Sequence, residues 1–137
     1  MAVFESSDQL YETLKILFSR IAKDKPDSAA AVSKSRLYLR LRTTSPATEV
    51  NFNGRQNPLQ ITYGPSTVRP DIELELPAEM LHDILLGITP LKKVVASGKF
   101  KVRGPVWKAF VLEDIFHTGQ SIYPDILRQQ GLDGRLP

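Results

Sequence analysis

The sequence predicts an α+β fold: a five-stranded, mostly antiparallel sheet with one apolar face covered by about four to five helices. Two observations predict it. Apolar residues recur at helical spacing at the start of the chain and again in its second half. Between these regions, four consecutive segments alternate apolar and polar residues, which is typical of half-buried strands. Together the patterns give the element order α-β-β-β-β-α-α-β-α, in which helices cover the apolar face of the sheet.

The composition favours a single globular domain and excludes several kinds of chemistry. The chain has 137 residues and a formal net charge of +3, which is too small to indicate nucleic-acid binding by itself. It contains no cysteine, so disulfides, thiolate metal sites and a cysteine nucleophile are excluded. Acidic residues interrupt the first apolar run, and no apolar stretch approaches the ~20 residues that span a bilayer. We therefore expect a cytoplasmic protein.

The first helix is predicted over residues 6–24. Its apolar residues fall on one face at helical spacing: Leu10, Leu14, Leu17, Phe18 and Ile21. Ser6 or Ser7 can cap its N-terminus, and Pro26 ends it. Residues 27–35 can add a short helical turn.

Four strands are predicted next, over residues 36–42, 48–53, 58–64 and 71–76. In the first, Leu37, Leu39 and Leu41 alternate with Tyr38, Arg40 and Arg42, and the other three follow the same pattern. The turn pairs Ser45-Pro46, Asn53-Gly54 and Gly64-Pro65 separate the strands. This pattern predicts a sheet with one apolar and one solvated face.

The second half of the chain supplies further helices and a fifth strand. Helices are predicted over 77–87 and 89–98, each with a proline at its start and a glycine at its end. A strand over 99–103 and a helix over 105–116 follow. Residues 121–131 can form another short helix, broken near Pro124.

A basic stretch runs from Lys92 to Lys108, with six cations and no acid. Within it, Lys99, Lys101 and Arg103 alternate with apolar residues, so the favoured interpretation is the solvated face of a strand. A patch that attracts anions or membrane headgroups is the alternative. A nucleic-acid surface is disfavoured, because Phe100 and Trp107 fall on apolar stripes and no phosphate-binding loop is present.

Residues 80–116 resemble the sterol carrier protein type-two family. The resemblance is carried by a helix ending at Gly87, a second helix ending in Ser97-Gly98-Lys99, and a strand leading from Lys101 to Gly104. The strand at 71–76 and the whole element order are also similar. By architecture the resemblance covers residues 8–118. We therefore expect a single lipid-binding domain over residues 1–118 and a C-terminal extension over 119–137.

The resemblance implies an apolar tunnel between sheet and helices that takes a fatty acid, acyl-CoA, sterol or isoprenoid lipid. The side chains expected to line it are Met80, Ile84, Leu85, Leu91, Val95, Phe100, Trp107, Phe110 and Val111. Lys92, Lys93 and Lys99 are expected to contact an anionic headgroup or a membrane surface. No metal or other cofactor is expected. The short helices over 77–97 are expected to form a lid that shifts at Gly87 and Gly98.

Three functions remain open, and none is assigned a catalytic residue. The first is binding and transfer of a hydrophobic ligand, and the second is an accessory domain that holds a hydrophobic intermediate for a partner enzyme. The third is a small isomerase or cyclase, for which His82, Tyr38 and Tyr63 are the candidate ionisable groups. His82 and Asp83 are adjacent on a helix and point about 100° apart, so no direct pairing is expected.

Overall fold

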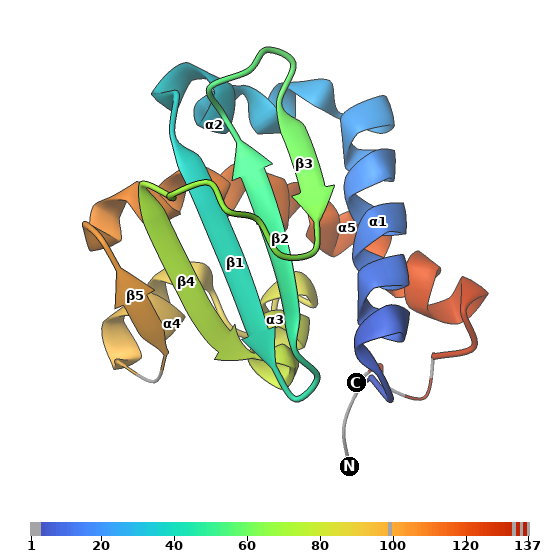
Figure 1. Ribbon diagram of the computed structural model, residues 1–137. Helices are drawn as coiled ribbons and strands as arrows, with labels where there is room; N and C mark the ends of the chain where they lie inside the picture. The colour runs from blue at the N-terminus through green and yellow to red at the C-terminus, as the bar shows by residue number, and fades with distance from the viewer. Residues whose placement is uncertain (1–3, 99, 133, 135, 137) are drawn as a thin grey trace.

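Helices cover one face of a five-stranded sheet in the computed structural model, which describes residues 4–98, 100–132, 134 and 136 (Figure 1). The elements are α1 (Ser7–Asp24), the 3-10 helix η1 (Pro26–Ala29), α2 (Ala30–Ser35), β1 (Tyr38–Thr44), β2 (Thr48–Asn53), β3 (Gln60–Tyr63), β4 (Ile72–Pro77), α3 (Ala78–Leu85), α4 (Leu91–Ser97), β5 (Lys101–Arg103), the 3-10 helix η2 (Val106–Leu112) and α5 (Glu113–Gln129). The predicted α+β class is confirmed.

The strands are ordered β3-β2-β1-β4-β5. Only the central β1–β4 pair is parallel, and the other three pairings are antiparallel. Leu41 of β1 lies beside Val50 of β2 and Leu74 of β4, and all three are buried. The sheet therefore has the apolar inner face that the period-two pattern predicts.

The first helix matches its prediction closely. The Ser6 hydroxyl accepts a hydrogen bond from the Gln9 backbone N–H, which caps α1. The inner face of α1 packs against α5 and the sheet, with the Phe18 and Phe52 rings meeting edge to face at 5.3 Å. In Figure 1, α1 stands beside β3 and α5 passes behind the strands.

The C-terminal helices differ from their prediction. The predicted helix over 105–116 is instead the 3-10 helix η2 followed by the first turn of α5, and α5 continues through Pro124 to Gln129. A proline inside a helix costs about 3 kcal/mol. Burial of the side chains that continue the apolar stripe around it offsets that cost. These are Ile122, Tyr123, Ile126 and Leu127, each at most 7% exposed.

The boundary expected at residue 118 falls inside α5. Gly119, one residue later, is buried where α5 crosses α1 and α3, and an added Cβ would contact Ile21, Leu17 and Leu85 at 3.5–3.6 Å. The segment after residue 118 therefore packs into the same hydrophobic core as α1 and α3.

The outer face of the sheet carries a buried ionic cluster around Arg40. The Arg40 side chain is 11% exposed; its Nε lies 3.2 Å from Glu49, and its Nη1 lies 3.5 Å from Glu73. It also donates to the Asn51 side chain and to the Ser66 and Val68 carbonyl groups. This face is therefore only partly solvated, because the segment between β3 and β4 covers Arg40.

A buried polar contact joins α3 to α5. Nδ1 of His82 lies 2.6 Å from the Tyr123 hydroxyl oxygen, and the two residues are 5% and 0% exposed. The Phe4 ring approaches His82 edge-on at 6.3 Å. Burial raises the pKa of Tyr123 far above its usual range, and the negative charge of Asp83 raises it further. The phenol is therefore held neutral in the folded protein.

We expect the folded protein to lose stability as the pH rises above about 10, where tyrosine ionises in the unfolded chain. The folded-state pKa of Tyr123 is raised, so its contribution is complete below that pH and is lost above it. Burial also raises the pKa of Tyr63, to about 12, which acts in the same direction. The loss is about 1.4 kcal/mol per pH unit for each proton retained only by the folded state.

Urea unfolding between about pH 9 and about pH 11 measures this loss. Tyr123→Phe should lower stability at neutral pH, because it removes the contact with His82, and should make the alkaline decline shallower. An equally steep decline in the variant would show that Tyr123 does not cause it.

Candidate ligand-binding cavity

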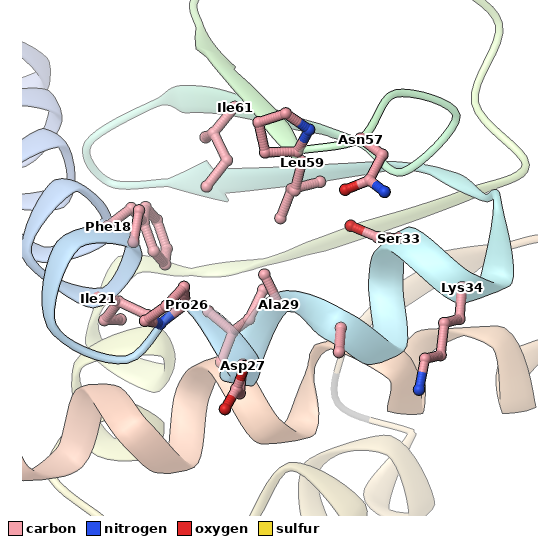
Figure 2. Close-up of a pocket in the computed structure, with 14 residues that line it drawn as sticks. Phe18, Ile21, Pro26, Asp27, Ala29, Ser33, Lys34, Asn57, Leu59 and Ile61 are labelled. Carbon is pink, nitrogen blue, oxygen red and sulfur yellow. The ribbon is translucent and has the colours of Figure 1, made fainter.

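An apolar cavity of about 340 Å³ lies between the C-terminal half of α1, the η1–α2 segment and the β3 side of the sheet. Phe18 and Ile21 of α1 and Ile115 of α5 form its floor, and all three are at most 3% exposed. In Figure 2, Leu59 and Ile61 point from the β3 side toward Pro26 and Ala29 on the opposite wall. These walls can hold an alkyl chain without polar contacts.

The polar lining residues lie at the rim of this cavity. They are Asp27, Ser33, Lys34 and Asn57. The Ser33 hydroxyl and the Asn57 side-chain amide face the same side of the opening in Figure 2. Among the described residues, neither side chain has a hydrogen-bond partner in the protein, so both can bind the polar end of a ligand.

Gly54 sets the position of the α2 wall. A Cβ at Gly54 would lie 2.4 Å from the Val32 carbonyl oxygen and 2.6 Å from that of Leu37, so the β2–β3 turn packs directly on the α2 backbone. The Gly54 N–H donates to the Leu37 carbonyl oxygen at 2.8 Å. The predicted Asn53-Gly54 turn therefore also positions one side of the cavity.

The nine residues expected to line a tunnel lie elsewhere. Ile84, Leu85 and Leu91 are buried in the core. Five others are partly buried against the core: Met80, Val95, Phe100, Phe110 and Val111. Trp107 is 66% exposed. None of the nine lines the cavity between α1, α2 and β3. Their contact with a ligand stays a prediction.

The buried face of η2 does not include Trp107. In a 3-10 helix, residues three apart share a face, and here Ala109 and Leu112 are the buried pair. Trp107 and Phe110 share another face, on which Trp107 is exposed and Phe110 is partly buried.

Two further hollows lie near the predicted lid. Met80 lines an open groove of about 700 Å³ between α3 and α4, together with Asp83 and Lys93. Ile84 and Leu91 line a smaller hollow whose other side carries carboxylate and imidazole groups of α5. Both hollows have charged walls. Such walls suit an alkyl chain less well than the apolar walls of the cavity between α1, α2 and β3. Lys92 and Lys93 are exposed on α4, and Lys99 lies outside the described residues.

The candidate ionisable groups for an enzyme are also outside the cavity. His82 contacts Tyr123, the Tyr38 hydroxyl lies 3.2 Å from the Ser66 hydroxyl, and Tyr63 has Lys15 over its ring at 5.6 Å. The described part of the chain contains no cluster of three or more potential metal ligands. In that same part, no helix is both long and apolar enough to cross a membrane.

Comparison with known proteins identifies the fold. No protein-family model matches the sequence, and no curated protein matches it at a significant level. Solved structures do match: sterol carrier protein 2 from Yarrowia lipolytica has a TM-score of 0.60 at 18% identity, covering 88% of this chain and 98% of that one. The chain has the sterol carrier protein 2 fold.

Two other matches show the range of proteins that share this fold. The sterol carrier protein domain 2 of Helicoverpa armigera matches with a TM-score of 0.54 at 19% identity, covering 93% of this chain and 91% of its own. A UbiJ-SCP2 ubiquinone synthesis protein also matches with a TM-score of 0.54, at 18% identity, covering 80% of this chain and 96% of its own. The sterol carrier protein 2 fold predicted from residues 80–116 is thus confirmed across most of the chain.

Proposed function

We propose that this chain binds a hydrophobic molecule with a polar end in the cavity between α1, α2 and β3. The observation that carries the proposal is the contrast between its apolar walls and its polar rim. Burial of an alkyl chain contributes about 0.8 kcal/mol per CH₂, so apolar walls are enough for binding. The matched structures named as sterol carrier proteins support the same class of ligand.

The size and rim of the cavity favour a single-chain lipid. Ligand pockets span roughly 300–1,000 Å³, and a cavity of about 340 Å³ is near the lower end of that range. Ser33 and Asn57 can donate to a carboxylate or hydroxyl at the opening, and the nearby Lys34 favours an anionic head. A fatty acid fits this arrangement better than a sterol.

We propose binding rather than catalysis. Among the described cavity-lining residues, the ionisable side chains are Asp27 and Lys34, and both are exposed at the rim. A general acid or base needs to lie within hydrogen-bond reach of the reacting group, and these two lie away from the apolar interior. The enzyme alternative therefore has less support than transport or presentation of the ligand.

A role as an accessory domain for a partner enzyme is the second candidate. It is favoured by the match to a protein named for ubiquinone synthesis. The open groove between α3 and α4 offers such a partner a surface away from the cavity. Stable co-purification of an enzyme would distinguish this role from free transfer. For either role we propose the cytoplasm as the compartment; a chain without cysteine forms no disulfide and is compatible with its reducing conditions.

Native mass spectrometry of the freshly purified protein, followed by organic extraction, tests the proposal. We expect a retained lipid, or uptake of an added fluorescent fatty acid, at about one molecule per chain. A protein that carries no lipid and takes up neither a fatty acid nor a sterol would contradict it.

A further inference from the structure

An exposed apolar tip projects from the β5 edge of the sheet. We define the tip as Val106, Trp107 and Lys108. Val106 is 43% exposed and Trp107, the single tryptophan of the chain, is 66% exposed. The Lys108 amino group lies 5.8 Å from the Trp107 ring centre. The exposed tryptophan and valine leave neighbouring apolar surface in water, and such a surface is a candidate contact site.

The backbone on either side of the tip packs tightly against the rest of the protein. Gly104 has a φ of +109°, and a Cβ there would lie 2.7 Å from the Asp71 carbonyl oxygen, so the turn before the tip packs tightly against β4. Ala109 and Leu112, on the inner side of η2, are fully buried. Trp107 is therefore presented outward by a fixed support rather than by a loose loop.

Positive charge surrounds the tip. Lys101 and Arg103 of β5 precede it, and Lys92 and Lys93 lie on α4, which contacts η2. Glu75 and Glu73 lie 3.7 Å from Lys101 and Arg103 and offset part of that charge. Lys92, Lys93 and Lys108 have no carboxylate within 4.0 Å among the described residues. Asp71, Glu113 and Asp114 also lie near this surface, so its cationic character depends on the three lysines that have no carboxylate partner.

We propose that this tip docks the protein on a bilayer containing anionic lipids, with Trp107 inserted at the headgroup level. Tryptophan is enriched at membrane–water interfaces because its ring is apolar and its N–H remains hydrogen-bonded. Nearby lysine and arginine side chains add electrostatic attraction to an anionic surface. A partner protein fits less well, because the tip is a small projection and not a broad apolar patch.

The position of the tip links docking to the proposed ligand cavity. η2 packs against α2, and α2 forms one wall of the cavity and carries Lys34 at its rim. A membrane that holds the tip therefore contacts an element that packs against one wall of the cavity. The inference deepens the proposed function, but vesicle binding is measured without any ligand in the cavity.

The single tryptophan makes the test direct. The full chain is mixed with phosphatidylcholine vesicles, with and without phosphatidylglycerol, and Trp107 fluorescence is recorded. We expect a blue shift and quenching by brominated lipid only with the anionic vesicles. Both should weaken as salt rises from about 0.1 M to about 1 M, because the screening length falls from roughly 10 Å to roughly 3 Å.

Variants are then compared by vesicle co-sedimentation. Trp107→Ser should weaken binding by about tenfold, and Lys108→Glu by more than about fivefold, because it reverses a charge. Ile88→Ser is the matched control, since Ile88 is 56% exposed but lies in the α3–α4 connection, and it should bind like the wild type.

Unchanged binding by Trp107→Ser, or equal binding to neutral and anionic vesicles, would overturn the docking proposal. An absence of vesicle binding at low salt would also overturn it. That conclusion would stand even if the tip were found to bind another protein. Fatty-acid uptake in vesicle-free solution is scored separately and should be unchanged in Trp107→Ser. In the wild-type protein, a failure to take up fatty acid would count against the cavity alone, and a failure to bind anionic vesicles would count against the tip alone.

Discussion

Replacing Ala29 with phenylalanine is expected to abolish uptake of a single-chain lipid while leaving the protein folded. Ala29 lies on the cavity wall opposite Leu59 and Ile61, and a phenyl ring there would occupy the space of the alkyl chain (Figure 2). Loss of a few buried CH₂ groups at about 0.8 kcal/mol each should weaken binding by more than about tenfold. Titration with a fluorescent fatty acid measures the change, and urea unfolding checks the fold.

Two further variants show whether the effect comes from this cavity. Ile61→Trp fills it from the opposite wall and should also block uptake. Val95→Trp lies on α4, within the lid predicted from the sequence, and should bind as the wild type does. If Val95→Trp blocks uptake and the two cavity variants do not, the ligand lies under α3 and α4, and the proposed site is wrong.

Replacing Arg40 with methionine is expected to lower the free energy of unfolding by about 3 kcal/mol. Removal of one partner from a buried ion pair leaves the other charge uncompensated, which typically costs 3–5 kcal/mol. Here the change leaves Glu73, which is 8% exposed, and Glu49 without their nearest buried cation. It also frees the carbonyl groups of Ser66 and Val68. Urea unfolding of the variant measures the loss.

Arg42 provides the matched control for this effect. It lies two residues along β1, contacts Glu49 at 3.9 Å and has a side chain that is 46% exposed. Exposed ion pairs contribute about 0–1 kcal/mol, so Arg42→Met should change stability little. Adding Glu73→Gln to Arg40→Met should restore part of the loss, because it removes a buried carboxylate whose remaining cation, Arg103, is exposed. Equal losses from Arg40→Met and Arg42→Met would show that the Arg40 cluster does not stabilise the fold.

Much of the fold could be predicted because its elements carry strong periodic patterns. The apolar face of α1, the alternation in β1 and the prolines and glycines around α3 and α4 each determine a local structure. The course of the chain near Pro124 could not be predicted in this way. A local rule ends a helix at proline, and only packing of the surrounding side chains against α1 and α3 overrides it.

The candidate cavity was harder to predict than the fold. Its walls combine large residues of α1 and β3 with small ones such as Ala29 and Ala30, and small residues give no periodic signal. The apolar stripes of α3, α4 and η2 predicted a lining instead, but most of those side chains fill the core or pack against it. The run of alanines over residues 29–31 is the sequence feature that indicates small side chains near α2. Similarly, the apolar stripe predicted for residues 105–116 did not indicate that Trp107 would be exposed while Ala109 and Leu112 are buried.

One wall of the cavity is an edge strand. β3 has four residues and hydrogen bonds to β2 alone, whereas the core strand β1 is paired on both sides. Such an edge separates from the sheet at a lower free energy than global unfolding requires. Ligand exchange can therefore proceed by brief local opening of the β2–β3 hairpin, while the hydrophobic core around β1 and α5 stays intact. The lifetime of a bound lipid would then be set by the stability of this hairpin and not by the stability of the whole protein.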